Sequence, residues 1–182
     1  MNCLKSVRFM RDYGTIRIAI FSVFATMVYF TLFYVLFLNL HPQLQINRFS
    51  FPILLAALIL IYPLHKLFHC FPIWLVGRKA SLSLEWQSNR FPILFCDPSG
   101  PISRNLSIVC VAFPGVAITV LSLMVAPMIP LFFHYIAVAS SINFGLAVTD
   151  FIYLSYLIKA PSHAYVEDFR EGFHILVQTF KH

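Results

Sequence analysis

The chain has 182 residues, of which 59% are hydrophobic and only 11% are charged. A soluble globular domain is about a quarter charged, so this composition excludes an ordinary soluble domain. The net charge is +6, but the basic residues stand in short clusters between long uncharged runs and do not predict one basic face. We therefore expect the lipid bilayer as the surroundings of this protein and no nucleic acid as a partner.

The first two predicted elements are membrane-spanning helices. Residues 18–40 form a run of 23 residues without a charge, which is long enough to cross a hydrocarbon core of about 30 Å. The run is too long for the core of a signal peptide, so we expect a retained first span. A polar link at 41–50 follows, and the apolar pattern resumes over 51–75, the predicted second span.

A β-hairpin is predicted after the second span. Residues 81–86 alternate between polar and apolar side chains, which is typical of a strand with one apolar face. We expect the turn at 87–90 and the return strand at 91–95, before a break rich in proline and glycine.

The last two spans share one uncharged run. The 45 residues 105–149 lack any charge, and as one helix they would extend about 68 Å, more than twice the thickness of the hydrocarbon core. The run must fold back, and Pro127 and Pro130 mark the turn. We predict spans at 106–126 and 131–158, followed by a tail.

The expected fold class is an all-α integral membrane protein. It has four transmembrane helices, a short cytoplasmic β-hairpin between the second and third, and a short cytoplasmic tail at 159–182, all within a single membrane domain spanning residues 1–182. Lysine and arginine set its orientation, because they concentrate on the cytoplasmic side of multi-pass proteins. Four precede the first span, four lie between the second and third, and three follow the fourth, whereas the opposite links hold only Arg48. We expect a multi-pass protein of the cell membrane with both termini cytoplasmic.

Two charges lie inside predicted spans, Lys66 in the second and Asp150 in the fourth. A charge at the centre of a membrane helix costs about 2.5–3.5 kcal/mol on insertion scales, so it usually has a functional or pairing role. His65 and His69 flank Lys66 at positions i and i+4, which places both rings on one helix face. Counted from the predicted cytoplasmic helix ends, the histidine pair and Asp150 lie at the same depth.

Two interpretations of these residues stay open. Two histidines and a carboxylate from a neighbouring helix form the three-ligand set of a catalytic zinc site, with His65, His69 and Asp150 as the ligands. The other interpretation needs no metal: Lys66 and Asp150 form an intramembrane ion pair in a structural or accessory membrane protein.

The sequence also resembles a known family. The segment 65–69 in a second span, the hairpin, the later Thr149-Asp150, and the following 158–161 and 166–168 are similar to the membrane family described as putative zincin peptidases, which resemble the site-2 intramembrane metalloproteases in plan. The resemblance implies zinc as a cofactor and His65, His69 and Asp150 as its ligands. It also matches Asn143 to an asparagine that often precedes the aspartate of the family.

One departure from that pattern concerns the mechanism. In His-Glu-x-x-His proteases the residue after the first histidine is the general base, and in this chain it is Lys66. A protonated lysine cannot accept a proton, so Lys66 occupies the position of the catalytic general base but cannot act as one. We expect a proteolytically impaired pseudoenzyme that binds or regulates a membrane-protein or peptide client. An active zinc-dependent intramembrane protease with an unusual base is the alternative.

Two further expectations concern packing. The small residues near the middle of the fourth span, which include Gly145 and Ala147, allow close approach of a helix, for which we expect the second span. The four cysteines make no CxxC pair and no repeated spacing, so we expect no disulfide framework, and Cys70 is expected only to pack.

Overall fold

Four long helices dominate the computed structural model, which describes residues 2–8, 13–40, 50–87, 91–169 and 172–177. The helices are α2 (Thr15–Leu40), α3 (Phe51–Leu75), α4 (Arg104–Met128) and α5 (Phe133–Lys159), and the short 3-10 helix η1 (Pro130–Phe132) joins the last two. All four are long and apolar enough to cross a membrane. They coincide with the predicted spans to within three residues at each end, while the predicted link at 41–49 lies outside the described residues.

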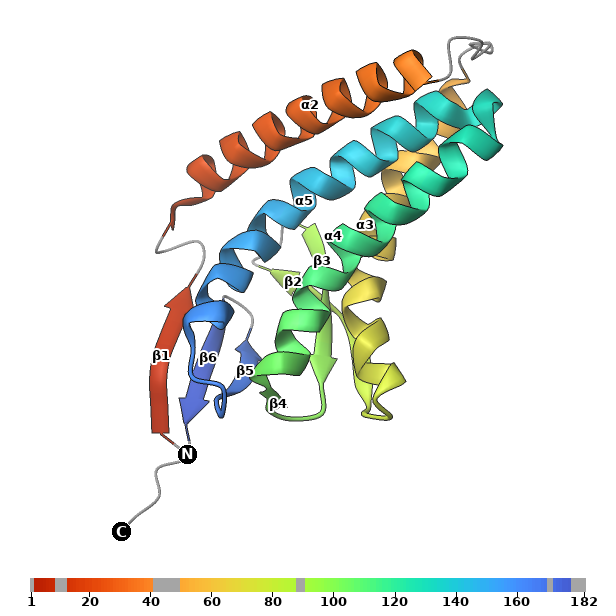
Figure 1. The fold of residues 1–182 in the computed structure, drawn as a ribbon. Coiled ribbons are helices and arrows are strands. Elements are labelled where there is room, and N and C mark those ends of the chain that lie inside the picture. Colours follow the sequence, from red (N-terminus) through yellow and green to blue (C-terminus); the bar gives the residue numbers. More distant parts are fainter. Residues whose placement is uncertain (1, 9–12, 41–49, 88–90, 170–171, 178–182) are drawn as a thin grey trace.

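Helix α5 is the central helix of the bundle. It contacts α2, α3 and α4, and Figure 1 shows it running between α2 and α4. This position explains why α5 buries small and polar residues, whereas α2 exposes large apolar side chains such as Phe21 and Phe24, as expected of a surface that faces lipid. Near the end of the bundle that carries η1, Phe33 and Phe37 of α2 pack against Phe133 of α5.

Helix α2 packs closely against α5 at Gly145. A Cβ atom at Gly145 would lie 2.0 Å from Thr26 Oγ1 and 2.9 Å from the carbonyl oxygen of Ser22, both on α2. Ala147 instead faces Gly115 of α4. The second span, α3, does contact the fourth, α5, as expected, but it does so through polar side chains. The expectation that Gly145 and Ala147 form this contact was wrong, because they face α2 and α4.

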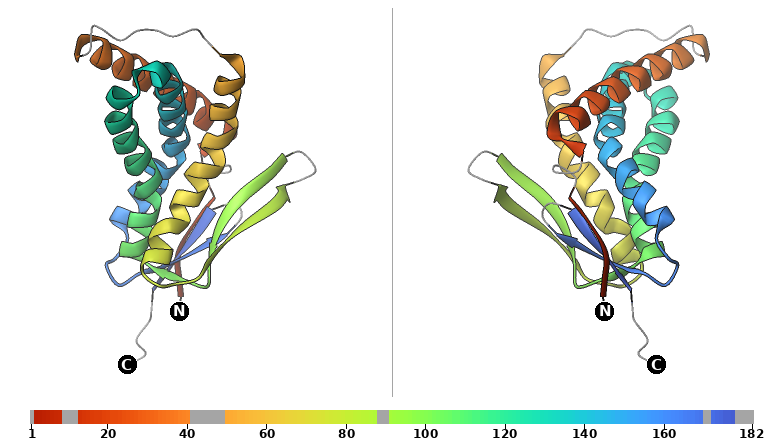
Figure 2. Two further views of the ribbon diagram at one scale, coloured as in Figure 1. Left: turned by 90° about the vertical axis from the view of Figure 1, so that its right-hand side faces the viewer. Right: turned by 90° about the vertical axis from the view of Figure 1, so that its left-hand side faces the viewer.

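The predicted hairpin is present. Strand β2 (Ala80–Gln87) pairs with β3 (Phe91–Pro98) in an antiparallel two-stranded sheet, and the turn residues 88–90 lie outside the described residues. The return strand runs three residues beyond the predicted 91–95. A disulfide between Cys70 and Cys96 ties helix α3 to β3, so the expectation that Cys70 only packs was wrong. Figure 2 shows the hairpin projecting from the side of the bundle.

The chain ends form a second sheet that the sequence analysis did not predict. Four antiparallel strands lie in the order β1-β6-β5-β4, and they comprise β1 (Asn2–Arg8), β4 (Ile102–Ser103), β5 (Tyr165–Phe169) and β6 (Gly172–Val177). The expected all-α class thus becomes a mostly helical fold with two small antiparallel sheets, and the expected tail contains two strands of a sheet.

This sheet packs against one end of the helix bundle (Figure 1). Phe173 of β6 is fully buried with Leu157 of α5 and Val111 of α4. Arg104 at the start of α4 donates hydrogen bonds to the carbonyl oxygens of Leu157 and Ile158, at 2.7 and 2.8 Å. These carbonyls belong to the last turn of α5, where the usual helical donors run out. The carbonyl of Leu157 also accepts from the N–H of Ala160 at 3.2 Å, whereas Pro161 has no N–H to donate. The sheet therefore fixes the ends of α4 and α5 that flank the candidate site.

Candidate metal centre

The three predicted metal ligands come together between α3 and α5. The Nε2 atom of His65 lies 3.1 Å from Oδ2 of Asp150, and Nε2 of His69 lies 3.6 Å from Oδ1 of the same carboxylate. One ligand atom from each residue lies within 4.8 Å of the others. The equal depths expected for the histidine pair and Asp150 therefore agree with these contacts.

Both histidine rings are held through their other nitrogen. Nδ1 of His69 lies 2.9 Å from the carbonyl oxygen of Cys110, which can only accept, so this nitrogen carries the hydrogen. Nδ1 of His65 lies 2.8 Å from Oδ1 of Asn143. The Asn143 amide nitrogen donates to the carbonyl oxygen of Pro114 at 3.5 Å, which orients Oδ1 as the acceptor for His65. A second hydrogen bond of this kind is usual for metal-binding histidines.

The donor set fits a cation. With a neutral ring whose hydrogen sits on Nδ1, Nε2 presents a lone pair, so two lone pairs face the carboxylate of Asp150. Oδ2 of Asp150 is buried and has no hydrogen-bond partner among the described residues, so its 3.1 Å approach to Nε2 of His65 brings two acceptors together. Ligands about 2.1 Å from a tetrahedral zinc ion lie about 3.4 Å from each other, close to the two separations found here. A divalent cation would remove the repulsion between these acceptors.

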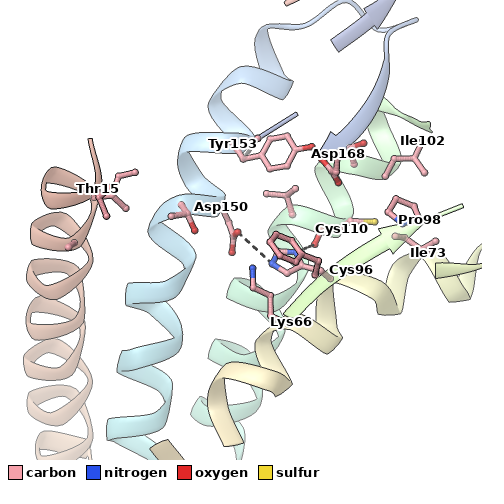
Figure 3. Close-up of a pocket in the computed structure, with 18 residues that line it drawn as sticks. Thr15, Lys66, Ile73, Cys96, Pro98, Ile102, Cys110, Asp150, Tyr153 and Asp168 are labelled. Carbon is pink, nitrogen blue, oxygen red and sulfur yellow. Dashed lines mark hydrogen bonds and ion pairs between the residues drawn. The ribbon is translucent and has the colours of Figure 1, made fainter. Parts of the chain in front are cut away.

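Lys66 lies beside this group without joining it. Its side chain lines the cavity onto which His69 and Asp150 open, and Figure 3 shows Lys66 and Asp150 reaching toward the same region. Among the described residues, the carboxylate of Asp150 contacts the Nε2 atoms of His65 and His69 and forms no ion pair with Lys66. The ion pair of the structural alternative is therefore not formed here.

The cavity has a volume of about 430 Å³ and is walled by all four long helices and by strands of both sheets. Helices α2 to α5 contribute, as do β3, β4 and β5, and most of the lining side chains are apolar. Phe95, Cys96 and Pro98 bring strand β3 to the cavity. The hairpin therefore borders the space beside the candidate metal centre.

A second polar pair lines the same cavity. Tyr153 of α5 donates a hydrogen bond to Asp168 of β5, and Figure 3 shows the two side chains meeting above the metal centre. Asp168 is exposed toward the cavity, yet protein atoms surround it on its other sides, and this burial raises its pKa to about 6. Asp97 raises the pKa as well, while the hydrogen bond from Tyr153 and the charge of Lys66 lower it.

Sequence reasoning named the three residues that converge here but missed part of their surroundings. Asn143 was expected from the resemblance, whereas Cys110 contributes only a backbone carbonyl, which leaves no side-chain signature. The pairing of Tyr153 with Asp168 was missed because residues 159–182 were expected to be a tail, so nothing placed Asp168 near the fourth span. His134, at the other end of α5, contacts the Tyr34 hydroxyl at 2.5 Å.

Comparison with known proteins yields one family. Residues 58–165 match the family described as "Putative zincin peptidase", and this segment is more than half of the 182 residues. It contains α4, the hairpin and all three candidate ligands. No curated protein and no solved structure matches the chain. The chain belongs to the family described as putative zincin peptidase.

Proposed function

We propose that this protein is a zinc-binding membrane pseudoenzyme that holds a polypeptide client in its cavity and has lost most proteolytic activity. The observation that carries the proposal is the convergence of the Nε2 atoms of His65 and His69 on the carboxylate of Asp150. The zincin description of the family supports zinc as the ion.

The three ligands would leave a fourth coordination position toward the cavity, as in catalytic zinc sites. Zinc at such a site supplies a Lewis acid, which polarises a carbonyl group and acidifies a water molecule. Hydrolysis also needs a base that accepts the proton of this water, and Lys66 stands where the glutamate of His-Glu-x-x-His proteases supplies it. A protonated ammonium group has three donors and no acceptor, so Lys66 removes the proton-accepting step.

The hairpin supports a polypeptide as the client. Strand β3 lines the cavity, and the sheet it forms with β2 has only two strands among the described residues, so each strand has one edge without a strand partner there. An extended polypeptide can add to such an edge through backbone hydrogen bonds, with its side chains in adjacent apolar space. The mostly apolar cavity suits a segment drawn from a membrane protein.

Restoring the base tests the loss of proteolysis. We compare the wild type with Lys66→Glu, Lys66→Gln and His69→Ala, using a synthetic membrane-spanning Leu/Ala peptide that carries a fluorophore and a quencher, with zinc present. We expect wild type and Lys66→Gln to match the His69→Ala background and Lys66→Glu to exceed it at least tenfold, since one general base contributes about 10²–10⁴-fold. Zinc-dependent cleavage by the wild type that His69→Ala abolishes would show an active protease.

A photocrosslinker tests the client site. The photoreactive residue benzoylphenylalanine is introduced in cells at one of two positions. It replaces either Phe95, which lines the cavity, or Phe24, whose side chain is 65% exposed on α2. We expect discrete polypeptide adducts at position 95 that are absent at position 24. The same adducts at both positions would argue against a client in the cavity.

A further inference from the structure

Pro114 frees the carbonyl group that holds His69. It is buried in the interior of α4, and because proline has no N–H, the carbonyl of residue 110, four positions earlier, lacks its usual helical partner. A backbone carbonyl at membrane depth needs another donor. The Nδ1–H of His69 is that donor, at 2.9 Å from the oxygen of Cys110.

The same proline also supports His65. The carbonyl oxygen of Pro114 accepts from the amide nitrogen of Asn143 at 3.5 Å, and Oδ1 of that amide accepts from Nδ1 of His65 at 2.8 Å. One residue of α4 therefore acts on both rings, through the N–H that it lacks and through the carbonyl that it presents.

We propose that Pro114 is a positioning residue of the metal centre: the N–H that it lacks leaves the Cys110 carbonyl to His69, which keeps the hydrogen of that ring on Nδ1 and directs its Nε2 atom at Asp150. The backbone carbonyl at position 114 supports His65 through Asn143 whatever the residue there. This inference rests on the proposed function for its metal. A residue with an N–H at position 114 closes the helical hydrogen bond to Cys110, which then competes with His69 for the carbonyl. The His69 ring loses its fixed orientation, and metal affinity falls with it, as it does when other supporting hydrogen bonds of metal ligands are removed.

The test compares Pro114→Ala with Pro127→Ala, the second proline inside α4. The first readout is the fraction of His65 and His69 rings with a hydrogen on Nδ1, from ¹⁵N NMR of metal-free protein in detergent. The second is zinc affinity, measured by competition with a chelator. Pro114→Val, closer to proline in volume, takes the place of Pro114→Ala if the alanine variant does not fold.

We expect Pro114→Ala to reduce the Nδ1–H fraction of His69 and to weaken zinc binding about 10–100-fold, while Pro127→Ala matches the wild type in both readouts. Wild-type behaviour of Pro114→Ala in both readouts, or an equal loss in Pro127→Ala, overturns the inference. If the wild type takes up no zinc, the proposed function fails, and the NMR readout by itself then decides whether Pro114 orients the His69 ring.

Discussion

Nε2 of His65 lies 3.1 Å from Oδ2 of Asp150, although the two residues are 85 positions apart (150 minus 65) and belong to different helices. Side chains of this kind are costly in a membrane unless they are paired or functional. Asn143 and the Cys110 carbonyl hold the two histidine rings in place beside Asp150. The proposed zinc site is based on this convergence of side chains.

Asn143→Ala is expected to weaken zinc binding about 10–100-fold with little change in the fold. The substitution removes the acceptor for Nδ1–H of His65, and loss of such a supporting hydrogen bond typically has an effect of this size on metal affinity. Zinc affinity is measured by chelator competition. Ser141→Ala is the matched control, because Ser141 is equally buried on α5 and, within the part of the chain that the structure describes, its hydroxyl bonds only to the Ala137 carbonyl of its own helix. Equal affinities in both variants would contradict the role given to Asn143.

A pair of glycine substitutions tests the packing of α2 on α5. Gly145→Ala is expected to lower the free energy of unfolding by about 1–3 kcal/mol, the usual cost of overpacking, because the new Cβ would lie 2.0 Å from Thr26 Oγ1 and 2.9 Å from a backbone oxygen. Gly115→Ala is expected to be near neutral, since its Cβ would lie 3.4 Å from that of Ala147. Unfolding in detergent measures both, and a more harmful change at Gly115 would show that this helix contact is wrong.

Asp168 predicts a pH dependence of stability. Its folded pKa of about 6 lies above the ordinary value of 3.8, because burial disfavours the charged carboxylate. Between these values the folded state binds the proton more tightly, so the stability contributed by Asp168 is complete below about pH 4 and is lost as the pH rises through 6. Asp168→Asn should flatten this part of the profile of thermal unfolding from about pH 4 to pH 7. A profile as steep as that of the wild type would exclude Asp168 as the titrating group.

The disulfide bears on the orientation of the protein. The positive-inside rule predicts a cytoplasmic hairpin, where thiols are kept reduced, so we expect Cys70 and Cys96 to be thiols in cells and to pair on oxidation. Acid quenching of intact cells, followed by alkylation, counts the thiols, and Cys96→Ser gives the reference for an unpaired Cys70. A disulfide already present at quenching would place the hairpin on the oxidising side.

The spans and the candidate ligands were predictable because their signals are local. An uncharged run of sufficient length defines each span, and charged or imidazole groups inside such runs are conspicuous. The second sheet was not predictable in this way, since β1 pairs with β6 at the other end of the chain. The Cys70–Cys96 bond likewise depends on where the hairpin folds back. Pro114 was readable in principle, because a proline in a span always frees the carbonyl four residues earlier, but only the fold shows which side chain uses it.

The central claim is the metal site, and the metal content of the detergent-purified protein tests it most directly. Plasma mass spectrometry compares the wild type with His69→Ala and Asp150→Asn, and Lys66→Gln serves as a control that leaves all three ligands in place. We predict near-stoichiometric zinc in the wild type and in the control, and its loss in both ligand variants. Wild-type protein without metal after incubation with zinc, or zinc that persists in both ligand variants, would contradict a site formed by His65, His69 and Asp150.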